Sequence, residues 1–69
     1  MAELDLSAPS TRFLQKLIRE RTPVEIKLHN GDILSGLLRW QDAECLAVET
    51  QLGEMILWRT AVTYIRQTS

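Results

Sequence analysis

The spacing of apolar residues changes at Thr22-Pro23, and this change limits the possible folds more than any other feature of the chain. Before it, apolar residues recur at three- and four-residue intervals, the pattern of a helix with one buried face. These residues are Phe13, Leu14, Leu17 and Ile18. Proline ends such a helix, because the residue before it avoids the α region. The sequence therefore predicts a helix over residues 10–21, with Ser10 or Thr11 as its cap.

After Pro23 the apolar residues alternate with polar ones, as in strands with one side exposed to water. Asn30-Gly31 is a strong hairpin signal, because both residues can take positive φ, and Gly36 indicates a bend in the next strand. Five strands are predicted, over residues 24–29, 32–41, 44–49, 54–59 and 61–66. One helix followed by five short strands indicates a mainly β fold, a strongly bent antiparallel barrel.

A chain of 69 residues forms one domain with a small core, which gives only marginal stability by itself. Cys45 is the single cysteine and there is one histidine, so we expect no disulfide, no metal and no cofactor. The domain is predicted over residues 10–66, between a flexible segment over 1–9 and a short tail over 67–69.

The last two strands are too apolar to remain open sheet edges, because uncovered edges of this kind aggregate unless another chain pairs with them. We therefore expect one of these strands to pair with the other in a neighbouring subunit, so that repetition of the contact closes a ring. The residues expected at this subunit interface are Met55, Leu57, Trp58, Val62 and Tyr64.

The formal net charge of −1 excludes a uniformly basic nucleic-acid binder, so any phosphate contacts must come from local cationic clusters. No apolar run approaches the roughly 20 residues that span a bilayer, and the acidic start is unlike a signal peptide. A free cysteine fits a reducing compartment, so we expect a cytoplasmic protein without membrane insertion. The sequence offers no Ser/His/Asp set, glycine-rich phosphate loop or paired carboxylates, so we do not expect an enzyme.

The segment from Arg19 to Gly36, with Trp40 and Asp42 beyond it, resembles the first Sm motif in the form found in the bacterial Hfq family. It reads Arg-Glu-Arg-Thr-Pro-Val-Glu-Ile-Lys-Leu-His-Asn-Gly-Asp-Ile-Leu-Ser-Gly, and Trp58-Arg59-Thr60-Ala61 stands where the family has its second motif. The resemblance covers about residues 10–66 and is closest to the divergent cyanobacterial branch. It implies an Sm-like fold, a homohexameric ring and an RNA chaperone that pairs small regulatory RNAs with messenger RNAs.

The resemblance also implies three RNA-binding surfaces. Those on the outer rim are Gln15, Lys16, Arg19 and Arg21; those on the pore side are Arg59 and Thr60; those on the opposite face are Lys27 and Ser35. Where the family stacks bases on a phenylalanine and a tyrosine, this chain has Glu44 and Lys27. The uridine and adenine sites are therefore degenerate, and we expect weak or atypical binding of single-stranded RNA.

Two functions follow from these residues. The first is a ring that regulates genes after transcription by binding RNA. The alternative is a ring-shaped scaffold whose main partner is a protein, with RNA binding largely lost; resemblance to the cyanobacterial branch implies a link to pilus-dependent motility. In this alternative, Ile18, Asp32 and Glu44 would provide the surface on which the partner docks.

Overall fold

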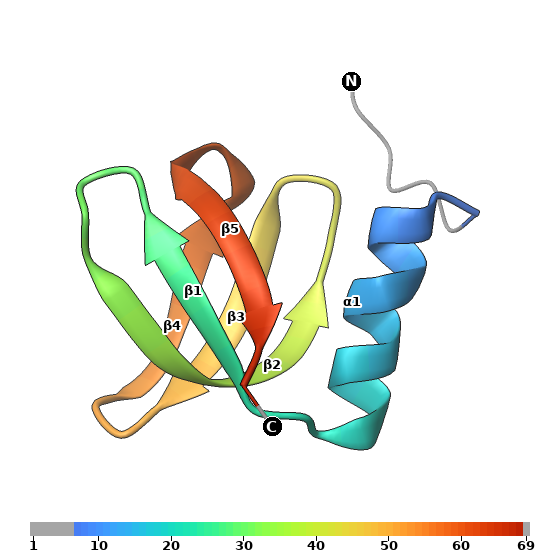
Figure 1. Cartoon of the computed structure of the whole chain (residues 1–69), viewed down its shortest axis with the longest axis horizontal. Helices are drawn as coiled ribbons and strands as arrows, with labels where there is room; N and C mark the ends of the chain where they lie inside the picture. Colours follow the sequence, from blue (N-terminus) through green and yellow to red (C-terminus); the bar gives the residue numbers. More distant parts are fainter. Residues whose placement is uncertain (1–6, 69) are drawn as a thin grey trace.

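A computed structural model describes residues 7–68, in which one helix lies against a strongly bent sheet (Figure 1). Helix α1 spans Pro9–Glu20, and a 3-10 turn, η1, spans Arg59–Ala61. The strands are β1 Val24–Leu28, β2 Ile33–Gln41, β3 Cys45–Thr50, β4 Gly53–Trp58 and β5 Val62–Gln67. Neighbouring strands are antiparallel, in the order β4-β3-β2-β1-β5. The predicted fold class, a helix followed by five strands of a bent antiparallel sheet, is confirmed.

The ends of the expected domain are only partly within the described residues. Residues 1–6 of the expected N-terminal segment, and Ser69 of the expected tail, lie outside them. Pro9, expected in the N-terminal segment, is the first residue of α1, and Gln67, expected in the tail, is the last residue of β5.

Helix α1 begins and ends differently from the sequence prediction. Its N-cap is Ala8, whose carbonyl accepts the N–H of Arg12 at 3.0 Å, and no side chain caps the helix. The cap expected from Ser10 or Thr11 is wrong, because Pro9 occupies the first helical position and moves the start of the helix upstream. At the other end, Arg21 takes the left-handed conformation, with φ 51° and ψ 46°.

Two backbone hydrogen bonds close the C-terminal end of α1. The N–H of Arg21 donates to the carbonyl of Ile18 at 3.3 Å, and that of Thr22 donates to Leu17 at 3.1 Å. This is the Schellman arrangement, in which glycine usually takes the left-handed position because it has no Cβ. Here an arginine takes it, so the end of the helix carries backbone strain.

The β1–β2 hairpin turns through His29, Asn30 and Gly31. Leu28 accepts the N–H of Gly31 at 2.9 Å and donates its own N–H to Asp32 at 2.8 Å. Among the described residues of this turn only Gly31 has positive φ, 97°, so the expectation that Asn30 would share that conformation is wrong. Three residues rather than two form the loop, and such loops need a positive φ only at the last position.

The bend of the sheet lies in the middle of β2. Its first half, through Gly36, pairs with β1, whereas the half from Leu37 onward pairs with β3. A Cβ atom on Gly36 would overlap the carbonyl oxygen of Glu49, so only glycine allows β2 and β3 to approach this closely. The register also shifts between Leu38 and Trp40. The expected bend at Gly36 is therefore confirmed.

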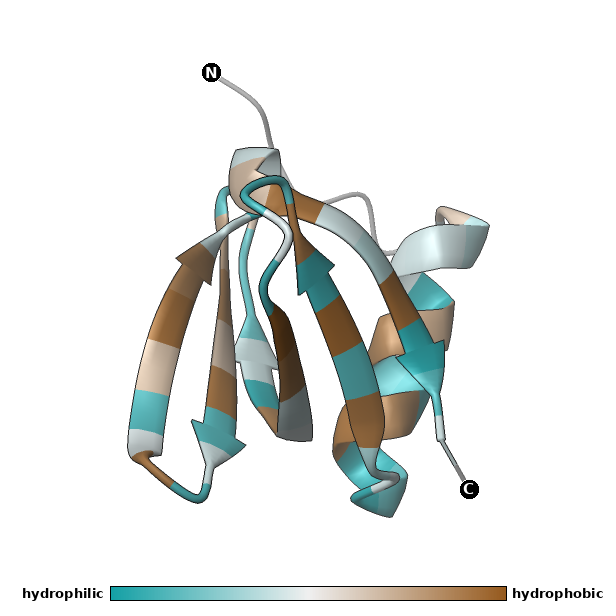
Figure 2. Cartoon of the chain, turned by 60° about the vertical axis from the view of Figure 1, so that its left-hand side comes forward, coloured by the Kyte–Doolittle hydropathy of each residue, from teal (hydrophilic) through white to brown (hydrophobic). Residues whose placement is uncertain are grey.

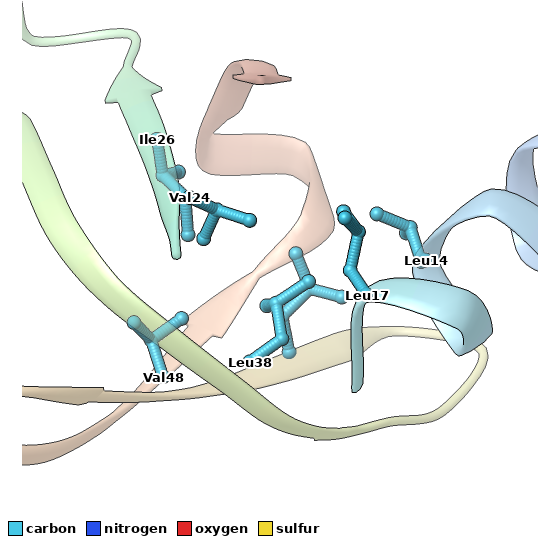
Figure 3. Close-up of a cluster of buried hydrophobic side chains, with 7 residues drawn as sticks. Leu14, Leu17, Val24, Ile26, Leu38 and Val48 are labelled. Atoms are coloured by element: carbon cyan, nitrogen blue, oxygen red, sulfur yellow. The ribbon is translucent and has the colours of Figure 1, made fainter. Parts of the chain in front are cut away.

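The core lies between α1 and the inner side of the bent sheet, where side chains from the helix and the strands point toward one another (Figure 3). Alternation along the strands places one set of residues inward and the other outward (Figure 2). The buried core residues are Leu14, Leu17, Val24, Ile26, Leu38, Leu46 and Val48. Half-buried residues that pack against them are Ile18, Leu28, Leu57, Val62 and Ile65.

Strands β4 and β5 lie at the two edges of the sheet. An edge strand leaves alternate backbone N–H and carbonyl groups without a partner in its own sheet. The two strands that the sequence marked as too apolar for open edges are thus the two strands that end the sheet. No helix within residues 7–68 is long and apolar enough to cross a membrane.

Candidate nucleic-acid interface

Three cations lie along the exposed side of α1. Arg12, Lys16 and Arg19 are all exposed, and none forms an ion pair within residues 7–68. Together with Pro9, Phe13 and Gln15 they line one open hollow. We call this set, Arg12, Gln15, Lys16 and Arg19, the helix patch. Arg12 was absent from the expected rim, although its spacing of four from Lys16 and seven from Arg19 would have placed it there.

The structure separates Arg21 from the helix patch. Arg21 lines a second, smaller hollow with Arg39, Ile18 and the start of the outer half of β2. The guanidinium of Arg39 forms an ion pair with Glu49 at 2.7 Å. The four residues expected to form one rim therefore fall into two groups, because the left-handed turn at Arg21 carries this residue away from the line of the helix.

Arg59, expected on the pore side, is tied to two neighbouring segments. Its Nε donates to the carbonyl of Asp42 at 2.9 Å, and its Nη2 donates to Oε1 of Gln41 at 2.6 Å. Gln41 in turn donates to Oε1 of Gln15 at 2.9 Å and to the carbonyl of Thr11 at 3.3 Å. Arg59 thus reaches the helix-bearing side of the molecule through Gln41, a residue that the sequence analysis did not single out.

The remaining residues near Arg59 differ in role. Oδ1 of Asp42 accepts the backbone N–H groups of Glu44 at 2.9 Å and Cys45 at 2.7 Å, and these bonds lower the pKa of Asp42. The backbone of Glu44 also accepts the N–H of Arg59 at 2.8 Å, while its side chain is exposed. Thr60 is exposed in η1. This corner therefore presents a hydroxyl and a carboxylate beside a half-buried guanidinium.

On the outer side of β1, Lys27 and its neighbours form a second polar group. Lys27 is half-buried and pairs with Tyr64 of β5, while Glu25 pairs with Arg66 of β5 and with Ser35 of β2. The carboxylate of Glu25 accepts the hydroxyl of Tyr64 at 3.0 Å and the Nε of Arg66 at 2.9 Å. These bonds, that from Arg66 first, lower the pKa of Glu25, and the bond to Glu25 raises the pKa of Tyr64.

The residues expected at the subunit interface lie on both sides of the edge strands. Leu57 and Val62 pack against the core, and Met55 is half-buried. Trp58 and Tyr64 are exposed. A further exposed residue of β4, Ile56, was not included in the expected interface. It pairs with Ala47, which in turn pairs with Trp40 of β2, so one apolar row crosses three strands.

A strongly bent antiparallel sheet of five strands, with an N-terminal helix and apolar strands at both edges, defines the Sm-like class of folds. Comparison with known families makes this more specific: the chain belongs to the Hfq-related family, whose model matches residues 8–67.

Two solved structures support the assignment. An Hfq protein from Anabaena sp. is 38% identical, with a TM-score of 0.81 over 93% of this chain and 100% of that one. A second structure, described as the pleiotropic translational regulator Hfq, is 16% identical, with a TM-score of 0.81 over 84% of this chain and 97% of that one. The second likeness supports the fold alone. No curated protein sequence matches the chain. The expected resemblance to Hfq, closest to the cyanobacterial branch, is confirmed.

Proposed function

We propose that the chain is the subunit of a homohexameric ring that binds single-stranded RNA in the cytoplasm and regulates genes after transcription. In this role it is a binding protein rather than an enzyme, and its partners are small regulatory RNAs or messenger RNAs. Membership of the Hfq-related family supports the class of function. The particular contacts must come from the residues of this chain.

The helix patch is the observation that carries the proposal. Its three cations, Arg12, Lys16 and Arg19, are exposed and without ion pairs among residues 7–68, whereas Arg39 and Arg66 are each neutralised by a glutamate. Unpaired cations bind phosphates and release counterions from the nucleic acid, which gives an affinity that depends on salt. A ring repeats the patch in every subunit, so an extended RNA would meet several patches at once.

The positions of β4 and β5 support the ring. Both are edge strands, and each carries an exposed aromatic residue, Trp58 on β4 and Tyr64 on β5. Pairing β5 of one subunit with β4 of the next would satisfy the free backbone groups at both edges. Since the same contact would repeat from subunit to subunit, it closes into a ring when the rotation is right.

Binding at the pore side is expected to be weak. Arg59 already donates to Gln41 and Asp42, so fewer of its N–H groups remain for a phosphate. The exposed carboxylate of Glu44 adds like-charge repulsion toward an RNA backbone at this corner. We therefore assign the larger share of RNA affinity to the helix patch.

The test is a titration of fluorescently labelled oligo-uridine and oligo-adenine at two salt concentrations. We expect binding that weakens steeply with salt, and replacement of Lys16 and Arg19 by alanine should reduce the slope by about 2, close to one for each lost phosphate contact. Arg39→Gln is the matched control, because Glu49 already neutralises that arginine. Absence of binding at low salt would overturn the proposal, and an unchanged slope would overturn the role of the helix patch.

A scaffold for a protein partner is the second candidate. It is favoured by Leu52, which is 87% exposed in the β3–β4 turn and lines an open hollow with Ile33, itself 54% exposed. Ile18, expected as part of the docking surface, packs against the core instead. Asp32 is exposed, but its carboxylate accepts the amide of Asn30 at 3.1 Å. A ring that binds neither oligonucleotide at low salt would favour this second candidate.

A further inference from the structure

One exposed tyrosine lies among cations on the outer side of the sheet. Val24 and Ile26 of β1 are fully buried, so alternation places Glu25 and Lys27 on the opposite, outward side. Directly paired residues of antiparallel strands point to the same side. Tyr64, which pairs with Lys27, and Arg66, which pairs with Glu25, therefore share this outward side. We call Glu25, Lys27, Tyr64 and Arg66 the Tyr64 cluster.

The ring of Tyr64 is both exposed and fixed. The residue is 38% exposed, and its hydroxyl donates to Oε2 of Glu25 at 3.0 Å. The carboxylate of Glu25 is itself held by Nε and Nη2 of Arg66, at 2.9 and 3.2 Å. An aromatic ring that is already oriented loses little conformational entropy when a ligand stacks on it.

The charges of the cluster favour an anionic ligand. Glu25 and Arg66 neutralise each other, which leaves Lys27 without an ion pair among residues 7–68. Arg66 uses two of its five N–H groups on Glu25, and its side chain is 62% exposed, so further donors face the solvent. An aromatic ring between two such cations matches a nucleotide, in which a planar base adjoins a phosphate.

We propose that the Tyr64 cluster binds one nucleotide of single-stranded RNA, with the base stacked on Tyr64 and the phosphate held by Lys27 and Arg66. The proposal rests on the RNA-binding function above and adds a second site on a different surface from the helix patch. The carboxylate of Glu25 is occupied by Tyr64 and Arg66, so it is not free to read the edge of a base. Stacking is possible for every base, so the site does not discriminate strongly between adenine and uracil.

The site is compatible with ring closure. Backbone pairing between β5 and a neighbouring strand takes place in the plane of the sheet, about 4.8 Å from strand to strand. The outward side chains of β5 project across that plane, so Tyr64 keeps its outward side after pairing.

The experiment measures oligo-adenine and oligo-uridine affinity at low salt for the unmodified protein, Tyr64→Leu and Tyr64→Phe, with particle mass checked by light scattering. Loss of a stacking ring is expected to weaken binding of both oligonucleotides by roughly 5- to 100-fold, whereas Tyr64→Phe keeps the ring and stays within about threefold. Lys27→Gln should reduce the salt slope by about 1. Undiminished affinity of Tyr64→Leu for both oligonucleotides would overturn this site while leaving the RNA-binding function intact.

A second measurement covers the case in which Tyr64→Leu fails to assemble. The unmodified protein is photo-crosslinked to an oligonucleotide that carries 4-thiouridine, digested with trypsin and mapped by mass spectrometry. We expect a crosslink on the peptide over residues 60–66, which contains Tyr64. Crosslinks confined to α1 would overturn the site, and no binding of any oligonucleotide would overturn the RNA-binding function itself.

Discussion

The side chain of Gln41 accepts a hydrogen bond from Arg59 at 2.6 Å and so connects the end of β2 to the corner between β4 and β5. The same side chain donates to Gln15 on α1 at 2.9 Å. One glutamine thus joins three segments that the sequence separates by 18 and 26 residues. We infer that Gln41 fixes the position of Arg59 relative to the helix.

Replacement of Gln41 by alanine is expected to lower the free energy of unfolding by about 1–2 kcal/mol, because the half-buried guanidinium of Arg59 loses a charge-assisted hydrogen bond. In a domain of this size that corresponds to a fall in Tm of roughly 4–16 °C, measured by thermal unfolding at fixed protein concentration. Gln51→Ala, in the exposed β3–β4 turn, is the matched control and should leave Tm unchanged. Equal Tm values for both variants would show that the Gln41 contacts contribute nothing.

The left-handed residue at the end of α1 gives a prediction of opposite sign. Arg21→Gly is expected to raise the free energy of unfolding by about 0.5 kcal/mol, because relief of the backbone strain exceeds the entropy that glycine adds to the unfolded chain. Arg19→Gly, two residues earlier inside the helix, should lower it by about 1 kcal/mol. Urea unfolding measures both, and a loss of stability in Arg21→Gly as large as in Arg19→Gly would contradict the strain at Arg21.

Much of the fold could be predicted because the local patterns are clear. The three- and four-residue spacing before Thr22 and the alternation after Pro23 locate the helix and the strands, and Gly36 locates the bend. The start of α1 was misplaced because Pro9 competes with Ser10 and Thr11, and a sequence pattern does not decide between them.

The candidate site was harder to predict, because its contacts join distant segments. Tyr64 meets Glu25 across 39 residues, a contact that depends on the register between β1 and β5. The periodicity of each strand gives its inward and outward sides, but not which residue faces which across strands that are far apart in sequence. By contrast, Arg12 could have been added to the rim from helical spacing alone.

The ion pair between Glu25 and Arg66 predicts how stability depends on pH. The pKa of Glu25 is lowered from its ordinary value of 4.5, so its contribution is fully present above that pH and is lost as the pH falls through the folded-state pKa. Glu25→Gln should therefore be less stable than the unmodified protein at neutral pH, and the difference should close in acid.

Urea unfolding between pH 3 and pH 7 measures this difference. Glu54→Gln, at an exposed glutamate of β4 that forms no ion pair within residues 7–68, is the control and should show little difference at any pH. A gap between Glu25→Gln and the unmodified protein that stays constant down to pH 3 would contradict the assigned ion pair.

The close approach of β2 and β3 at Gly36 predicts a severe effect of a single methyl group. Gly36→Ala would place its Cβ against the carbonyl oxygen of Glu49, so we expect a loss of about 3 kcal/mol or more and much reduced soluble protein. Gly53→Ala meets no atom within 4 Å and carries only the strain of its φ of 117°, so a smaller loss of roughly 1–2 kcal/mol is expected. The two variants are compared by urea unfolding, and equal losses would contradict the crossing as described.

The most direct test of the account is the mass of the unmodified protein in solution, measured by light scattering coupled to size exclusion at micromolar concentration. Pairing of β5 with β4 of the next subunit predicts one species with about six times the mass of the 7.9 kDa chain. A folded, soluble monomer at that concentration would contradict it, because the apolar edges of the sheet would then be stable without a neighbour.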